Sequence, residues 1–132
     1  TMNRNIAFVD VVSEVTDELR ARVRRAIQAG VAAERIWVDP GIGFGKSADQ
    51  SLELLRATGR LREALGYPVL VGPSRKSFIG AVTGEPADRR LMGTASSAAA
   101  AIVAGADGVR LHDVGLLASA VRVADAIRRG RA

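Results

Sequence analysis

Short apolar segments that end near glycine or proline alternate with helical patterns along this chain, and this alternation limits the fold more than any other feature. Strands are predicted at residues 35–39, 67–72 and 108–112. Apolar residues spaced by three and four positions predict helices at residues 9–29, 47–65, 92–104 and 116–127. The order α-βα-βα-βα predicts parallel strands connected by crossover helices, which is an α/β fold.

The helix predicted at residues 47–65 carries two local signals. Ser47 and Gln50 have the spacing of a capping box, which predicts the start of the helix. Gly59 lies inside the same segment and marks an expected kink. One helix with a kink is therefore the expectation for this part of the chain.

The length of the chain is short for a complete fold of this class. It has 132 residues and offers three predicted strands. A doubly wound sheet usually has more strands, and a closed eight-stranded barrel needs about 250 residues. We therefore expect either an unusually small α/β domain or part of a larger one.

Composition excludes several classes of function. No apolar run approaches the roughly 20 residues of a membrane span, and there is no cysteine for a disulfide, a zinc site or a thiol nucleophile. No secretion signal is recognised, so we expect a cytoplasmic protein. The net charge of +5 comes from arginines interleaved with acidic residues, and aromatic residues make up 4% of the chain. This pattern argues against a nucleic-acid partner.

The most polar residues follow the three predicted strands. Asp39 ends the first strand, Ser74 and Lys76 follow the second, and Arg110 and His112 belong to the third. Each has a structural explanation of its own, such as a carboxylate that caps a tight turn or a basic loop in solvent. Parallel strands, however, bring their carboxyl ends to one edge of a sheet, where ligands bind. The sequence therefore predicts one site built from these residues.

The side chains at this edge suit an anionic substrate next to a polar heterocycle. Arginine binds phosphate with two hydrogen bonds, lysine adds a point charge, and histidine donates a hydrogen bond or moves a proton. Asp39 could accept two parallel hydrogen bonds from an amidine-like edge such as that of a pterin. Phe44 could pack on an aromatic substrate, and the spacing of GIGFGK at residues 41–46 matches neither common phosphate-binding motif.

These residues lie in blocks that resemble the C-terminal signature blocks of dihydropteroate synthase. The blocks are DPGIGFGK at 39–46, LVGPSRKSFIG at 70–80, Gly93-Thr94 at the start of an alanine-rich helix, and VRLHDV at 109–114. The resemblance implies a (β/α)8 TIM barrel of the pterin-binding type. Residues 1–132 would form the C-terminal part of that single domain, with the last three βα units and one preceding helix. The family's contacts from the first half of the barrel have no counterpart here.

The resemblance also implies a reaction and roles for individual residues. The family condenses 6-hydroxymethyl-7,8-dihydropterin pyrophosphate with p-aminobenzoate, releases pyrophosphate with the help of Mg²⁺, and is inhibited by sulfonamides. By resemblance, the catalytic residues are Lys76, Arg110 and His112; no metal ligand falls in this chain. The substrate-binding residues are Asp39 and Lys76 for the pterin, Arg110 and His112 for pyrophosphate, Ser74 and Phe44 beside p-aminobenzoate, and Gly43 and Gly72 for close approach.

Further expectations concern support and partners. Arg75 is expected to support its loop through an ion pair, Lys46 to have a structural or electrostatic role, and Asp113 to cap the last helix. A homodimer is expected through the alanine-rich helix and the last helix. Three strands cannot close a barrel, so the isolated chain is expected to be inactive. Two alternatives stay open: another pterin-binding barrel such as a methyltetrahydrofolate methyltransferase, and a catalytically silent paralogue or assembly module.

Overall fold

The computed structural model describes residues 10–132, and the predicted helix start at Val9 lies outside this range. Helices dominate, separated by short strands and loops. In chain order the elements are α1 (Val11–Gln28), η1 (Ala33–Arg35), α2 (Ala48–Arg56), α3 (Thr58–Leu65), β2 (Leu70–Val71), α4 (Ser77–Thr83), η2 (Ala87–Arg89), α5 (Leu91–Ala104), β3 (Gly108–Val109) and α6 (Val114–Arg129).

The extended segments are parallel, as the sequence predicts. Leu70 of β2 pairs with Gly108 of β3, and Val71 pairs with Val109. On the other side of β2, an isolated parallel bridge joins Val38 to the residue before β2. The three segments predicted as strands therefore lie side by side with the second in the middle, but the regular strands are shorter than expected. The segment at Val38 and strand β3 lie on the two outer sides of β2. Among the described residues each has a strand partner on one side only, and the regular hydrogen-bonded pairing is short.

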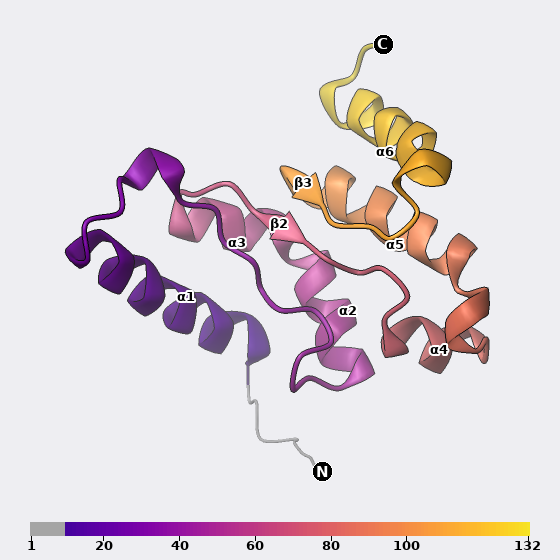
Figure 1. Cartoon of the computed structure of the whole chain (residues 1–132), viewed down its shortest axis with the longest axis horizontal. Helices are drawn as coiled ribbons and strands as arrows, with labels where there is room; N and C mark the ends of the chain where they lie inside the picture. The colour runs from indigo at the N-terminus through magenta and orange to yellow at the C-terminus, as the bar shows by residue number, and fades with distance from the viewer. Residues whose placement is uncertain (1–9) are drawn as a thin grey trace.

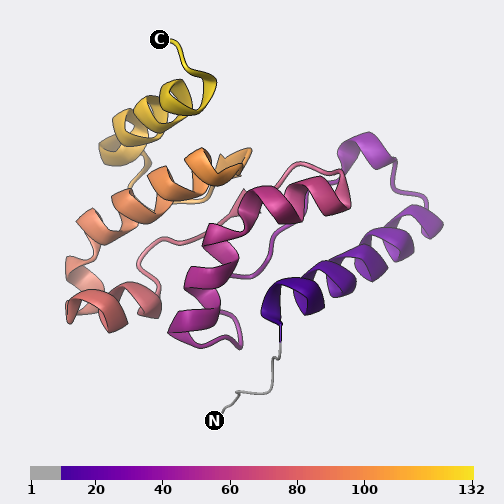
Figure 2. The ribbon, with the colours of Figure 1, turned by 180° about the vertical axis from the view of Figure 1, so that it is seen from behind.

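The helices cover one face of the extended segments (Figure 1). Seen from behind, α2, α3 and α5 lie in front of the strands (Figure 2). Side chains alternate along the segments, so that Val38, Val69 and Val71 face the helices and are 0–4% exposed. Trp37, on the opposite face, is 53% exposed. The core therefore lies between the strands and the helices, and the other face of the strands is open.

The predicted helix at residues 47–65 is wrong as a single helix. The capping box of Ser47 and Gln50 is present, but α2 ends at Arg56 and α3 begins at Thr58. The break lies at Ala57, close to Gly59, so the expected kink near Gly59 is present as a break between two helices. The buried Thr58 hydroxyl lies 2.7 Å from the Leu55 carbonyl and donates to it, an interaction that favours a bend at this point.

Helix α4, at Ser77–Thr83, was not expected from the sequence. It has seven residues, and its buried members Phe78 and Ile79 pack into the core. Gly93 of α5 makes this packing possible, because a Cβ at that position would lie 2.3 Å from Ile79 Cγ2. The short length leaves too few turns for a clear helical period, and tertiary packing supplies the stability.

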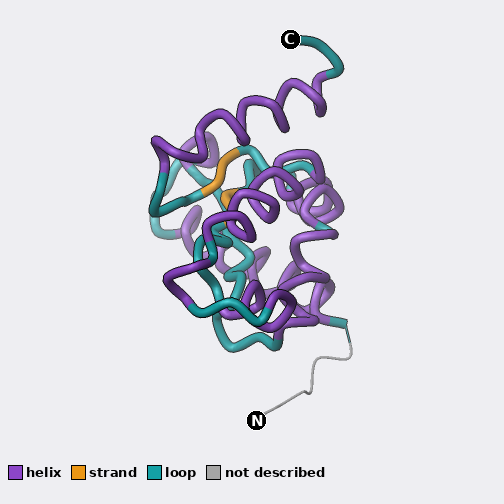
Figure 3. Tube along the Cα trace, turned by 90° about the vertical axis from the view of Figure 1, so that its right-hand side faces the viewer, coloured by secondary structure: helices purple, strands orange, loops and turns teal. Residues whose placement is uncertain are grey.

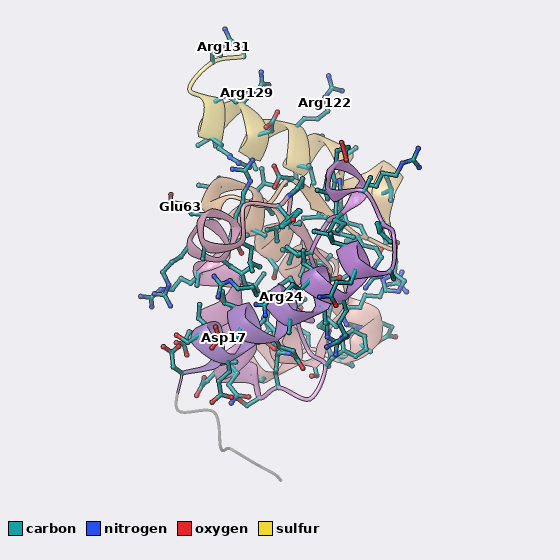
Figure 4. All side chains as sticks on the ribbon, turned by 90° about the vertical axis from the view of Figure 1, so that its left-hand side faces the viewer. Asp17, Arg24, Glu63, Arg122, Arg129 and Arg131 are labelled. Carbon is teal, nitrogen blue, oxygen red and sulfur yellow. The ribbon has the colours of Figure 1, made fainter. Side chains whose placement is uncertain are left out.

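Helix α5 packs against α2, α3, α4 and α6, and α6 lies at one end of the molecule next to α5 (Figure 3). Charged side chains of both signs, including those labelled on α1, α3 and α6, project from the outer surface (Figure 4). Among residues 10–132, no helix is long and apolar enough to cross a membrane.

Candidate functional site

The loop after the first extended segment begins with Asp39. Its Oδ1 accepts the Gly41 N–H at 2.9 Å, and the Phe44 N–H reaches the Gly41 carbonyl at 3.0 Å. One carboxylate oxygen thus caps a tight turn, which is a structural role. The other oxygen, Oδ2, has no hydrogen bond to the described residues and is available to a ligand.

Two side chains hold the backbone of the glycine loop in place. Ser51 of α2 is 1% exposed, and its Oγ accepts the Gly43 N–H at 3.2 Å. Lys46 Nζ donates to the Phe44 carbonyl at 2.9 Å. Burial lowers the pKa of Lys46, and the negative charges of Glu18 and Asp39 offset part of this decrease. Lys46 therefore has the structural role expected of it, whereas sequence reasoning missed Ser51.

Lys76 is brought against the glycine loop. Its ammonium group lies 3.9 Å from the centroid of the Phe44 ring, within the range of a cation–π interaction. Its aliphatic part passes over Gly43, where a Cβ would lie 3.1 Å from Lys76 Cδ. A side chain at Gly43 would therefore force Lys76 to shift by a few tenths of an ångström.

Ser74 and His112 meet across the ends of β2 and β3. Ser74 Oγ lies 2.6 Å from His112 Nδ1 and also accepts the His112 backbone N–H at 3.2 Å. Ser74 is 6% exposed, whereas the His112 side chain is exposed. The two residues are 38 positions apart in the sequence, so only the parallel pairing of the strands brings them together.

Arg75, between Ser74 and Lys76, has a φ of 57°, the one positive φ outside glycine among the described residues. Such a conformation costs about 1–2 kcal/mol. The Arg75 guanidinium pairs with Asp113 at 3.1 Å, as the expectation of a supporting ion pair requires. Asp113 occupies the N-cap position of α6 as expected, but its carboxylate makes no capping hydrogen bond there and binds Arg75 instead.

Helix α5 and the segment before it also hold the loop. Thr94, which is 0% exposed, accepts the Arg75 N–H on Oγ1 at 3.0 Å. Arg90 donates to the Arg75 carbonyl at 3.1 Å and to the Glu85 carbonyl at 3.0 Å. Sequence reasoning missed Thr94 and Arg90 as supports, because neither contact is local.

An open cavity of about 430 Å³ gathers most of the predicted site residues. The guanidinium of Arg110 lies across Gly72, where a Cβ would be 3.0 Å from Arg110 Nη2. The lining residues are Gly72, Ser74, Lys76, Arg110, Leu111 and His112. Phe44 and Gly43 join this group through Lys76, whereas Asp39 does not line the cavity. The arrangement places two cations and an imidazole around one space suited to an anion.

Known proteins are similar to this chain in sequence. A family described as "Pterin binding enzyme" matches residues 1–112. The dihydropteroate synthase of a Synechocystis strain is 45% identical over 130 residues, which are 98% of this chain and 45% of that protein. A probable bifunctional folylpolyglutamate synthase/dihydropteroate synthase of Halobacterium salinarum is 53% identical over 113 residues, 86% of this chain and 14% of that protein.

Solved structures agree with these relatives. A dihydropteroate synthase from Coxiella burnetii in complex with pteroic acid has a TM-score of 0.86 and 35% identity, and the match covers 90% of this chain and 44% of that one. The Yersinia pestis enzyme in a sulfonamide drug complex has a TM-score of 0.87 and 31% identity, with 93% and 44% covered. The chain thus spans under half the length of these relatives.

Proposed function

The chain belongs to the pterin-binding enzyme family, and from this premise we propose that it forms the C-terminal part of the TIM barrel of a dihydropteroate synthase. Residues 1–132 would be one portion of a single domain. The complete protein would join 6-hydroxymethyl-7,8-dihydropterin pyrophosphate to p-aminobenzoate. The cavity lined by Lys76, Arg110 and His112 is the observation that carries this proposal.

The first task of these residues is to hold the leaving group. Arg110 presents a planar guanidinium over Gly72, and His112 lines the same cavity. During the reaction the bond between the pterin methylene carbon and the pyrophosphate oxygen breaks, and pyrophosphate takes the electron pair. Cations and hydrogen-bond donors already in place stabilise the charge that develops there.

The second task is to hold the pterin. The free Oδ2 of Asp39 would accept hydrogen bonds from the ring edge, and the Lys76 ammonium group would donate a hydrogen bond to the ring. Electron release from the pterin stabilises positive charge on the methylene carbon. The amine nitrogen of p-aminobenzoate forms the new bond and then loses a proton, so no strong base is required.

The third task is to position p-aminobenzoate. Phe44 is 65% exposed and offers its ring as a stacking surface, with Ser74 on the cavity wall. The Yersinia pestis relative has been solved in complex with a sulfonamide drug. We propose that sulfonamides compete for the same space in this protein.

Mg²⁺ belongs to the proposal for the complete protein. Among residues 10–132 there is no group of three or more histidine, cysteine, aspartate or glutamate residues that could hold a metal ion. Magnesium commonly binds one or two carboxylates together with substrate phosphates.

A homodimer through the C-terminal helices is a further part of the proposal. Large apolar side chains are exposed on α5 and α6: Met92, Val103, Leu116, Val123 and Ile127. An exposed apolar surface of this kind favours contact with another protein surface. The mass of the complete protein in solution tests this: a monomer at micromolar concentration contradicts it. A cytoplasmic location remains a prediction from the sequence.

The function is tested by assaying the complete protein for a product that requires both substrates. We expect pyrophosphate release that depends on p-aminobenzoate and rescue of a strain lacking dihydropteroate synthase. Turnover with methyltetrahydrofolate and none with p-aminobenzoate would favour a methyltransferase. A folded protein that shows turnover with neither p-aminobenzoate nor methyltetrahydrofolate would favour a silent paralogue or assembly module.

The 132-residue chain alone is expected to show no turnover. The segments at Val38 and β3 each leave a strand edge without a strand partner among the described residues, and Trp37 on the open face is 53% exposed. In a closed barrel these edges and this face are covered. Measurable turnover by the purified chain would contradict this expectation.

A further inference from the structure

The hydroxyl of Ser74 has two hydrogen-bond neighbours, and both belong to His112. The backbone N–H of His112 can only donate, and it reaches Ser74 Oγ at 3.2 Å. The second neighbour is His112 Nδ1, 2.6 Å away. Among the described residues, Nδ1 is the one acceptor within hydrogen-bond distance of this hydroxyl.

The alternative placement of the hydrogen is unfavourable. If Nδ1 carried a hydrogen, two donors would point at Ser74 Oγ, and the hydroxyl hydrogen would have no acceptor among the described residues. Ser74 is 6% exposed, and an unpaired buried donor is costly. The geometry therefore favours a hydroxyl that donates to Nδ1, which leaves the imidazole hydrogen on Nε2.

We propose, on the basis of the proposed function, that Ser74 is a positioning residue that fixes His112 in the neutral Nε2–H tautomer. His112 then donates a hydrogen bond from Nε2 to a phosphate oxygen of the pterin substrate. Lys76 and Arg110, which line the same cavity, supply the positive charge. The guanidinium of Arg75 is paired with the carboxylate of Asp113, so the positive charge of Arg75 is partly neutralised.

This role differs from that of a direct substrate ligand. A direct ligand would change affinity without changing the imidazole of the ligand-free protein. A positioning residue changes the imidazole first and affinity as a consequence. The two roles are therefore separated by a measurement on the imidazole itself.

The first measurement is ¹⁵N NMR of the His112 ring in the complete protein without ligand. The signal is assigned by its loss in His112→Gln, and this chain contributes one histidine. In the wild type we expect Nδ1 to resonate as a nitrogen without hydrogen and Nε2 as one with hydrogen. In the Ser74→Ala variant we expect the ¹⁵N chemical shifts of Nδ1 and Nε2 to move toward each other, because the two tautomers of His112 then exchange. Identical spectra would overturn the proposal.

The second measurement is the Kd of inorganic pyrophosphate by calorimetry. Ser74→Ala should weaken binding by roughly three- to tenfold, the effect of one hydrogen bond. Ser97→Ala, which removes a hydroxyl bonded to the Gly93 carbonyl inside α5, should leave both the spectrum and the Kd unchanged. In a His112→Ala background the effect of Ser74→Ala should disappear.

The outcomes separate this proposal from the proposed function. Tight pyrophosphate binding by the wild type with an unchanged Ser74→Ala variant would overturn the positioning role and leave the function intact. No pyrophosphate binding by the wild type, with the expected tautomer shift, would contradict the function and leave the Ser74–His112 relationship in place. A persisting effect of Ser74→Ala without His112 would identify Ser74 as a direct ligand and overturn the proposal.

Discussion

The ammonium group of Lys76 lies 3.9 Å from the centroid of the Phe44 ring, so a lysine from the second strand end rests on an aromatic ring from the first. This contact joins two loops that the sequence separates by an entire helical segment. It depends on Gly43, which lies under the aliphatic part of Lys76. Both side chains belong to the proposed substrate site, so the contact lies within that site.

Phe44→Leu removes the ring and its attraction for the ammonium group, which contributes about 0.5–2 kcal/mol. We expect the Kd of p-aminobenzoate to rise by roughly three- to tenfold and the stability to change little, because Phe44 is 65% exposed. Phe44→Tyr keeps the ring and serves as the control. Equal affinities for p-aminobenzoate in wild type and Phe44→Leu would contradict the role of the ring.

Arg110→Ala removes the guanidinium that lies across Gly72. Because charge-assisted hydrogen bonds to phosphate are lost, we expect the Kd of pterin pyrophosphate to rise about 30-fold, or about 2 kcal/mol. The Kd of the unphosphorylated pterin should stay within about threefold. Arg122→Ala on the outer side of α6 is the matched control. Similar losses for both pterins, measured by calorimetry, would contradict the assignment of Arg110 to pyrophosphate.

Thr94→Val keeps the shape of a fully buried side chain and removes the acceptor of the Arg75 N–H. Because the strained backbone at Arg75 loses one of its supports, we expect a loss of about 1–2 kcal/mol of unfolding free energy and weaker substrate binding. Thr94→Ser retains the hydroxyl and should recover most of both. Denaturant titration and substrate Kd measure the effects. Loss of stability with unchanged Kd would show that Thr94 supports α5 but not the loop.

Gly59→Ala places a Cβ 2.4 Å from the Ala104 carbonyl oxygen, where α3 meets the end of α5. Neither backbone can move without disturbing the core, so we expect a loss of about 2 kcal/mol or more in unfolding free energy. Gly115→Ala in α6, where a Cβ meets nothing within 4 Å, should be neutral or stabilising by up to about 1 kcal/mol. Equal stabilities of the two variants in urea would contradict the close contact.

Asp107→Asn tests an ion pair that links α3 to the sheet. Asp107 Oδ2 accepts from Arg62 at 2.8 Å and from the Val69 N–H at 2.9 Å. Burial alone would raise the pKa of Asp107, but these hydrogen bonds and the charges of Arg62 and Arg128 outweigh it and lower the pKa. The ionised carboxylate therefore stabilises the folded chain.

The sign of the pH dependence follows from the lowered pKa. The stabilisation is fully present above the unfolded carboxyl pKa of about 4 and is lost as the pH falls through the folded value. We expect Asp107→Asn to cost about 1 kcal/mol at pH 7, since Arg62 is partly exposed, and to converge with the wild type at acidic pH. Asp125→Asn, in an exposed pair within α6, should cost under about 0.5 kcal/mol. A difference in urea stability that does not change with pH would contradict the charge argument.

The order of the elements and the residues at the strand ends followed from the sequence by itself. The spacing of apolar residues and the positions of glycines can be read within a few residues of each point in the chain. Helices α1, α5 and α6 and the capping box of Ser47 and Gln50 could therefore be predicted. Parallel strands place their carboxyl ends together, so the order of the strands was enough to assign Lys76, Arg110 and His112 to one site.

The tertiary structure alone decided how that site is held. Arg75 and Thr94 are 19 positions apart, and no local pattern indicates that they are bonded. No local pattern indicates that Ser51 binds the backbone of the glycine loop. No local pattern indicates either that the Asp113 carboxylate binds Arg75 instead of the first turn of α6. The short helix α4 also depends on packing against other segments, because its buried residues Phe78 and Ile79 belong to the core. Such contacts form between residues that are distant in sequence. Their contribution to stability is larger than the helix and turn propensities that a sequence pattern expresses.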